Sequence, residues 1–194
     1  MEKVLDIAHF IRYLKGSSLY VHLNRHGLVE QMSVGYLARG SHCRFEEPML
    51  VMVTSGLLKQ YNRFPISKTL SRFIQFLTPG MFCPSDGSPF YPLVRALEPT
   101  YLFYVPFRLV FPLIAKNRQF AFDLAVAMEL DYGSGLSFSH YLRCIKEPSL
   151  CMDLFLERYG NNVDYLSNRE IASYIGASES TTRQLLYFHY NKLL

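Results

Sequence analysis

The chain has 194 residues, of which 49% are hydrophobic and 19% are charged, a composition typical of a folded globular protein rather than a disordered segment. This length excludes a large multidomain enzyme or a repeat array, and no apolar run reaches the roughly 18 residues of a membrane-spanning helix. The net charge of +4 is unevenly divided, because residues 1–116 carry +6 and residues 117–194 carry −2. A nucleic-acid-binding module in the second part would need to gather a few cations locally.

The start of the chain and its cysteines both indicate a cytoplasmic protein. Glu2 and Asp6 stand where a secretory signal would need a basic start followed by an uninterrupted apolar core. The cysteines show no zinc-binding spacing, so we expect reduced and mostly buried thiols. Cys144 and Cys151 are seven residues apart and would share one face of a helix. The four cysteines are Cys43, Cys83, Cys144 and Cys151.

Residues 1–116 are rich in β-branched and aromatic residues and carry turn-forming pairs at short intervals, which is typical of an all-β unit. The apolar runs between these turns predict strands of a sandwich or barrel. The four strands with the clearest pattern are Met49–Val53, Leu57–Tyr61, Arg72–Leu77 and Tyr101–Val105.

The pattern becomes helical after Phe107. An apolar stripe at 3.6-residue spacing predicts a helix from about Lys116 to Tyr132, which should end at the Gly-Ser-Gly of residues 133–135. A further helix is expected from about Ser139 to Tyr159, kinked or divided by Pro148.

The stripe of the first of these helices has two possible partners. A second copy of the chain could cover it, which would make the protein a symmetric dimer with Leu124 and Met128 in the seam. The chain's own β unit could cover it instead.

Two short helices follow. Ser167 and Glu170 form the capping box of the first helix, Gly176 ends it, and Ser178 can cap the second. Two short helices joined by a tight glycine-containing turn form a helix-turn-helix, whose second helix can enter the major groove of DNA. The residues able to form the core between the two helices are Ile171, Ala172, Ile175, Ala177, Thr182 and Leu185.

On this interpretation the solvent-facing side of the second helix reads DNA. Arg183 is the one cation on that side and can bond guanine bidentately, and Gln184 can pair with adenine. The candidate DNA-binding residues are Ser178, Glu179, Ser180, Arg183, Gln184 and Tyr187.

Four fragments occur in an informative order: L-T-P-G-M-F at 77–82, R-A-L-E-P at 95–99, Y-V-P-F at 104–107, and the helix-turn-helix stretch at 166–185. Together they resemble the Crp/Fnr family of bacterial transcription regulators. The resemblance covers nearly the whole chain and implies an effector-binding double-wound β-roll, a dimerisation helix and a C-terminal winged helix. It also implies a regulator without enzymatic activity.

The sequence departs from that family where its effectors bind. Cyclic-nucleotide members carry a Gly-Glu and an Arg-Ser or Arg-Thr pair after the P-G-x-F turn, but residues 83–92 read C-P-S-D-G-S-P-F-Y-P here. We therefore expect neither cyclic AMP nor cyclic GMP to bind. The clustered N-terminal cysteines of the iron–sulfur members are missing as well, so no cofactor is expected.

A second departure concerns DNA. Only eight residues follow Leu186, too few for the β-hairpin wing of the family. Glu179, Ser180 and Gln184 stand where cyclic-nucleotide members read bases with Arg, Glu and Arg, so DNA specificity should differ or binding should be weak. The alternative is a regulator that kept the fold, lost DNA affinity and acts by binding a protein partner.

Other chemistry has little support. His22 and His26 have the i, i+4 spacing of a metal-binding pair, but no carboxylate or third histidine is near in sequence. Arg95 could hold a phosphate, although it does not match the family's phosphate-binding arginine. A cupin-like enzyme would suit a β-roll, but the His-x-His and Glu pattern of its metal centre is missing, and we expect no metal site.

We thus expect an α+β chain in three parts: a β-roll sensor-like domain at 1–116, a connecting and dimerisation helix at 117–135, and a helical helix-turn-helix domain at 136–194. The expected function is DNA-binding transcriptional regulation without enzymatic activity. The expected partners are double-stranded operator DNA and a second copy of the chain, with no membrane.

Overall fold

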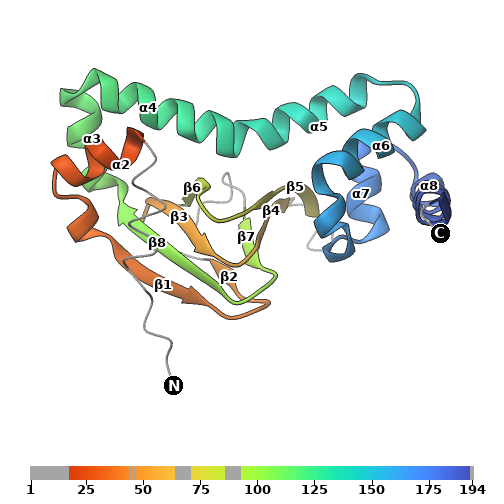
Figure 1. The fold of residues 1–194 in the computed structure, drawn as a ribbon, viewed down its shortest axis with the longest axis horizontal. Coiled ribbons are helices and arrows are strands. Elements are labelled where there is room, and N and C mark those ends of the chain that lie inside the picture. Colours follow the sequence, from red (N-terminus) through yellow and green to blue (C-terminus); the bar gives the residue numbers. More distant parts are fainter. Residues whose placement is uncertain (1–17, 44, 46, 64–70, 86–92, 193–194) are drawn as a thin grey trace.

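The computed structural model describes residues 18–43, 45, 47–63, 71–85 and 93–192 (Figure 1). Its first half contains two four-stranded sheets whose strand pairs are all antiparallel. The strands are β1 (Ser33–Leu37), β2 (His42–Cys43), β3 (Met49–Ser55), β4 (Leu58–Arg63), β5 (Ser71–Leu77), β6 (Phe82–Ser85), β7 (Leu93–Ala96) and β8 (Thr100–Pro106). One sheet has the order β1-β8-β3-β6 and the other β2-β7-β4-β5. The four strands expected from the sequence are confirmed as β3, β4, β5 and β8.

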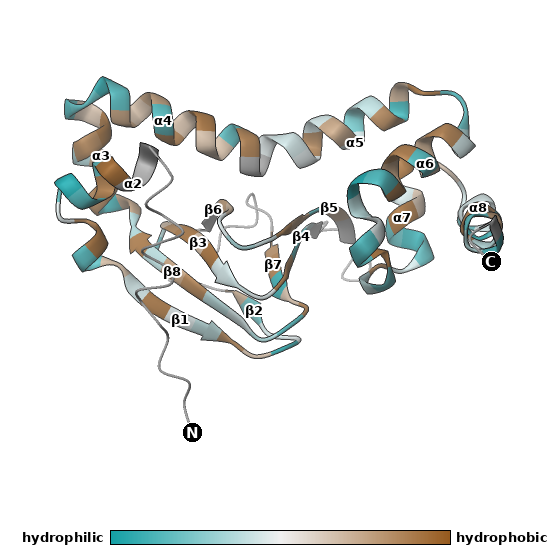
Figure 2. Cartoon of the chain, viewed as in Figure 1, coloured by the Kyte–Doolittle hydropathy of each residue, from teal (hydrophilic) through white to brown (hydrophobic). Residues whose placement is uncertain are grey.

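The first five residues of strand β3, 49–53, are apolar because both faces of the strand are buried there (Figure 2). Successive side chains of a strand point to opposite faces. Val51 and Val53 pack with residues of the second sheet, whereas Leu50 and Met52 pack with helices on the other side. The first sheet is thus the middle layer of this half of the molecule.

The turn between β3 and β4 requires glycine. Gly56 has a φ of +88°, and a Cβ there would lie 2.5 Å from the Pro99 carbonyl oxygen and 2.8 Å from Thr100 Cα. Side chains rarely adopt such a φ, and the backbone contact leaves no room for one.

The helices before and beside the sheets form the third layer. After α2 (Ser18–Arg25) and the short η1 (Val29–Gln31), the chain passes through the sheets and into α3 (Phe107–Lys116). Helix α4 (Arg118–Met128) then begins at Asn117, whose Oδ1 accepts a hydrogen bond from the Phe120 amide at 3.1 Å.

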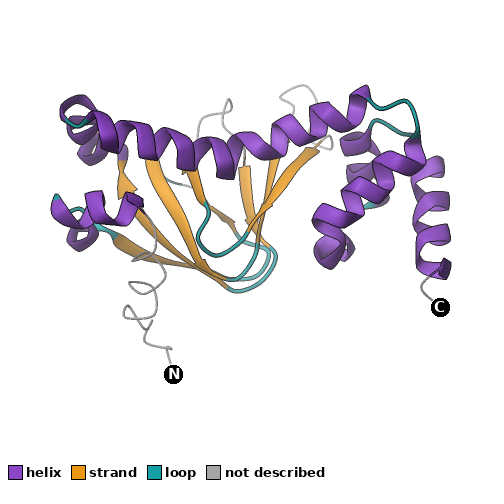
Figure 3. Cartoon of the chain, turned by 45° about the horizontal axis from the view of Figure 1, so that its top comes forward, coloured by secondary structure: helices purple, strands orange, loops and turns teal. Residues whose placement is uncertain are grey.

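The expected helix end at residues 133–135 is wrong. Helix α4 continues through a π turn, η2 (Glu129–Gly133), into α5 (Ser134–Cys144), and together they form one long bent helix across both sheets (Figure 3). Gly133 has the helical angles φ −68° and ψ −33°. Gly135 serves close packing instead, because a Cβ there would lie 2.6 Å from Gln75 Oε1 on β5.

The expectation that Leu124 faces a partner copy is also wrong. Leu124 is only 5% exposed and packs with Phe120 against the chain's own sheet and α2. Met128 is half-buried beside the same cluster. The chain's own β unit therefore covers this stripe.

The remaining helices form a C-terminal group that packs on β5. Pro148 divides the expected helix, since α5 ends at Cys144 and α6 (Pro148–Tyr159) starts at the proline. Cys144 and Cys151 therefore lie on different helices, the first exposed and the second buried. Cys43 is buried and the side chain of Cys83 lies outside the described part. The group is completed by η3 (Gly160–Tyr165), α7 (Asn168–Ile175) and α8 (Glu179–Lys192).

Candidate nucleic-acid interface

Helix α7 begins with the capping box that the sequence predicts. Ser167 Oγ accepts a hydrogen bond from the Glu170 amide at 3.3 Å, and Glu170 Oε2 accepts one from the Ser167 amide at 3.0 Å. The Ser167 amide, which precedes the helix, gains an acceptor in this way, and the Glu170 amide gains one besides the Ser167 carbonyl.

The turn between α7 and α8 also follows the expectation. Gly176 adopts a left-handed φ of 77°, and its amide and that of Ala177 both donate to the Ala172 carbonyl. Such an ending is common for helices and favours glycine. Ser178 Oγ then accepts a hydrogen bond from the Thr181 amide at 3.1 Å, which caps α8.

The inner faces of the two helices are buried together. Ala172 on α7 is small and buried, and Thr182 on α8 is fully buried. Ile171 and Ile175 belong to the large core of the C-terminal group, against which Leu185 and Ala177 are partly buried. The inward side of α8 predicted from the sequence is confirmed.

The outer side of α8 carries the candidate DNA-binding residues, and all of them are exposed. Tyr187 is 67% exposed, and it adjoins exposed Phe188. The exposed candidates are Ser178, Glu179, Ser180, Arg183, Gln184 and Tyr187.

The structure adds one cation that the sequence reasoning missed. Arg169 on α7 is exposed and its Nε lies 3.9 Å from Glu179 Oε1 across the turn. The acidic residue at the start of α8 is therefore partly neutralised, and Arg169 and Arg183 supply positive charge on the two helices. A separation of ten residues has no helical periodicity that would have signalled this pair.

Glu170 has a second task besides capping. Its Oε1 lies 2.8 Å from Lys59 Nζ on β4. Burial alone would raise the pKa of this carboxyl group, but the Lys59 ammonium and the Ser167 hydrogen bonds outweigh burial and hold the pKa below its ordinary value of 4.5.

This lowered pKa predicts an acid-dependent loss of stability. A carboxyl group with a lowered folded-state pKa stabilises the fold above the unfolded value, near 4.5, and loses that contribution as the pH falls through the folded value. The wild-type protein should therefore have a larger free energy of unfolding than Glu170→Gln, and the difference should be greater at pH 7 than at pH 3. Urea titrations of both proteins at the two pH values measure this, and an equal difference at both would contradict it.

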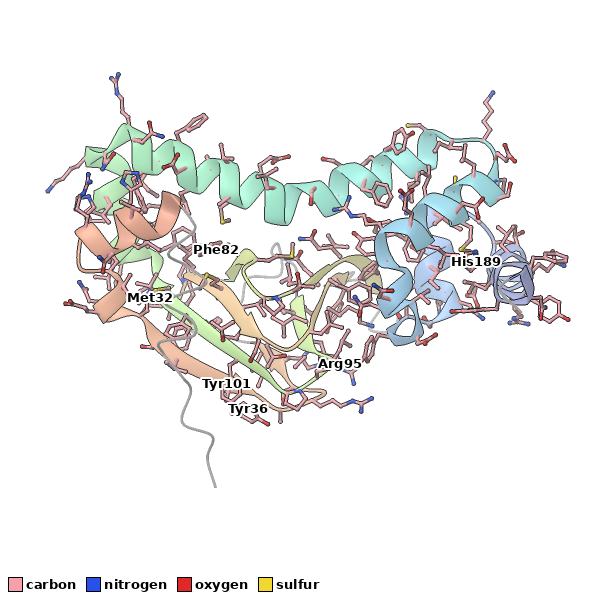
Figure 4. All side chains as sticks on the ribbon, in the orientation of Figure 1. Met32, Tyr36, Phe82, Arg95, Tyr101 and His189 are labelled. Carbon is pink, nitrogen blue, oxygen red and sulfur yellow. The ribbon has the colours of Figure 1, made fainter. Side chains whose placement is uncertain are left out.

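The other candidate sites lie apart from α8. His22 Nε2 is 3.2 Å from Asp123 Oδ2 and links α2 to α4, while His26 follows the end of α2. Arg95 is exposed on β7, on the roll (Figure 4). No group of three His, Cys, Asp or Glu side chains within the described ranges is placed to hold a metal ion. Residues 86–92, where the nucleotide-binding pattern departs from the family, lie outside the described residues.

None of the helices in the described part of the chain combines the length and hydropathy of a membrane span. The sequence matches no protein-family model and no curated protein significantly. The fold, however, matches solved structures over most of their length.

Three of these solved structures match most of the chain. A CooA mutant from Carboxydothermus hydrogenoformans has a TM-score of 0.64 at 16% identity, over 86% of this chain and 79% of that one. FixK2 from Bradyrhizobium japonicum has a TM-score of 0.64 at 15% identity, covering 83% and 85%. CLP from Xanthomonas campestris, described as a c-di-GMP responsive global regulator, has a TM-score of 0.62 at 12% identity, over 90% of this chain and 93% of that one. The chain shares the Crp/Fnr fold with these three proteins.

The fragments that carry the sequence resemblance occupy defined places in this Crp/Fnr fold. Residues 77–82 form the turn from β5 to β6, and residues 95–99 lead from β7 to β8. Residues 104–107 join β8 to α3, and residues 166–185 cover α7, its turn and the first half of α8. Each fragment thus marks a junction of the Crp/Fnr fold.

Proposed function

We propose that this chain is a DNA-binding transcription regulator in which α7 and α8 form a helix-turn-helix and the outer side of α8 enters the major groove. The observation that carries the proposal is the division of α8 into a buried inner side and an exposed outer side with hydrogen-bonding groups. A recognition helix needs this division, because one side must hold it in place while the other reaches base edges. The Crp/Fnr fold and the gene-regulatory role of CLP support it.

Local charge supports the proposal against the negative total of residues 117–194. Arg169 and Arg183 lie on the two helices, and the Arg169 ion pair offsets part of the Glu179 charge. With so few cations, few phosphates would be neutralised by one copy of the chain. The salt dependence of binding should accordingly be shallow.

A homodimer is part of the proposal. Phe122, Val126 and Leu130 are exposed at four-residue spacing along the long helix, so they form one apolar stripe on its solvent side. Large exposed apolar side chains in a row are typical of a protein interface. A two-fold dimer would present two copies of α8 to a palindromic operator and double the phosphate contacts.

Arg183→Ala tests the DNA-reading role. The guanidinium can bond guanine bidentately, so its loss should weaken specific binding by about 1 to 3 kcal/mol while the fold stays intact. Gel-shift and anisotropy titrations against genomic fragments at several salt concentrations measure the change. Arg108→Ala, at an exposed position on α3, is the matched control and should bind as the wild type does. If Arg183→Ala leaves every DNA affinity unchanged, the assignment is wrong.

Ala172→Leu gives the contrasting result. Ala172 is buried on α7, so a larger side chain should overpack its surroundings and lower stability by roughly 1 to 3 kcal/mol. Thermal melts should then separate the two variants, because only Ala172→Leu lowers the melting temperature. Equal melting temperatures would contradict tight packing around Ala172.

A further inference from the structure

The C-terminal helices pack directly on the second sheet of the β-roll. Phe73 and Phe76 of β5 join the core of the helical group, where the Phe73 ring centroid lies 5.3 Å from that of Tyr174 on α7. Tyr165 of η3 donates a hydrogen bond to Glu98 Oε1 at 2.7 Å. Together with the close contact between Gly135 and Gln75, these interactions connect two parts of the chain that are distant in sequence.

One of these connections is an ion pair at the start of α7. Lys59 Nζ on β4 lies 2.8 Å from Glu170 Oε1, with the two side chains only 11% and 13% exposed. The residues are 111 positions apart. By contrast, the ion pairs Arg108–Glu47 and Arg169–Glu179 lie on open surface.

Glu170 uses its two oxygens for different partners. Oε2 accepts hydrogen bonds from the amide and hydroxyl of Ser167, each at 3.0 Å, and thereby closes the first turn of α7. Oε1 faces Lys59. The same carboxylate therefore holds the end of α7 and fastens that end to the sheet.

Such a pair is suited to orienting helices. Replacing a buried ion pair by apolar side chains often costs no stability, whereas removing one partner leaves the other charge buried and unpaired. The aromatic contacts around Phe73 and Tyr174 supply burial, which has little directional preference. A hydrogen-bonded ion pair is directional, so it selects one placement of α7 on the sheet among those that bury similar areas.

We propose that Lys59 is a positioning residue: its ion pair with Glu170 latches the α7–α8 unit to the β-roll and fixes the direction in which α8 projects. Helix α8 follows α7 through the three-residue turn and shares its core, so a change at the start of α7 is passed to α8. Breaking the latch should release α7 and α8 locally while the sheets remain folded. Only the consequence for DNA rests on the proposed function.

Hydrogen exchange of the full chain tests the latch. Lys59→Met keeps the aliphatic stem and removes the charge, and Glu170→Gln keeps an oxygen for the Ser167 amide and removes the opposite charge. Each variant should raise amide exchange in residues 168–192 by about tenfold or more, with exchange in β3 and β8 unchanged. Arg108→Met, which breaks the exposed pair with Glu47, is the control and should leave residues 168–192 as in the wild type.

The double variant Lys59→Met with Glu170→Gln separates a latch from two independent effects. If Lys59 and Glu170 act through each other, amides 168–192 of the double variant should exchange no faster than those of the faster single variant. If the rate increases of the two single variants multiply in the double variant, the proposal is overturned. Unchanged exchange in both single variants, or a uniform rise that includes β3 and β8, would also overturn it.

A DNA titration relates the latch to function without depending on it. If α8 reads DNA, Lys59→Met should weaken binding by about tenfold although Lys59 lies on the β-roll, because α8 must be ordered again on binding. If the variants loosen α7 and α8 but no protein, including the wild type, binds DNA, the latch proposal stands and the DNA-binding proposal is rejected. If Lys59→Met and Glu170→Gln exchange as the wild type does, while Arg183→Ala loses DNA binding, the latch proposal is rejected and the DNA-binding proposal stands.

Discussion

Replacing Leu124 with aspartate should unfold the protein rather than divide a dimer. Leu124 is 5% exposed and packs among Phe120, Leu23 and Met52, between the long helix and the first sheet. The side chains of the cluster around Leu124 are apolar. Burying the charge unpaired costs several kcal/mol, a large part of the roughly 5 to 15 kcal/mol that stabilises a domain. Circular dichroism during urea unfolding should show little or no folded protein in water.

Phe122→Asp is the matched variant on the opposite side of the same helix. Phe122 is 64% exposed, so the charge stays in water and the fold should persist. Size-exclusion chromatography at micromolar concentration should show a dimer for the wild type and a monomer for Phe122→Asp. A folded, stable Leu124→Asp would contradict the packing described here, and a monomeric wild type would remove the dimer from the proposed function.

Replacing Tyr174 with alanine should have an effect of similar size in the C-terminal group. Tyr174 is fully buried, and its ring contacts Phe73, Phe155 and Tyr159 within 5.3 to 5.8 Å between centroids. Losing a buried aromatic side chain costs about 3 to 5 kcal/mol, because apolar contact is lost and a cavity remains. Thermal and urea unfolding measure the loss, and α7 and α8 should become disordered first.

Tyr174→Phe isolates the hydroxyl group. That group donates to the Gly135 carbonyl at 2.9 Å and lies 3.2 Å from the Tyr159 hydroxyl. Phenylalanine keeps the ring contacts and leaves a buried carbonyl without this donor, which should cost about 1 to 3 kcal/mol. A phenylalanine variant as unstable as the alanine variant would mean that the hydrogen bonds, rather than the ring packing, hold this group together.

Local patterns predicted the elements that local forces decide. The strand β3 has five apolar residues in a row, and the turn at Gly176 needs a left-handed residue, so both could be found from sequence. Strand β1 could not, because most of its side chains are exposed and it lacks an apolar run. The strands β2, β6 and β7 could not be predicted either, because they contain only two to four residues.

Tertiary contacts decided the features that the sequence could not predict. Periodicity showed that Leu124 lies on an apolar face but not which surface covers it. Gly135 resembled a helix end, although its role is to let α5 approach Gln75. On the candidate interface, capping and the inward and outward sides of α8 were predictable. The pairing of Lys59 with Glu170 was not, since 111 residues separate them.

The pairing of β1 with β8 has a consequence for biosynthesis. Ser33 lies opposite Tyr104, so the first strand of its sheet has no neighbour until the ribosome has released about seventy further residues. Strand β3 also waits for β8 on one edge, and its apolar side chains stay exposed during that time. Contacts between distant segments form slowly, and unpaired apolar strands are prone to aggregate. The nascent chain should therefore need shielding by chaperones until residue 106 has emerged, and slower synthesis at low temperature should raise the yield of folded protein.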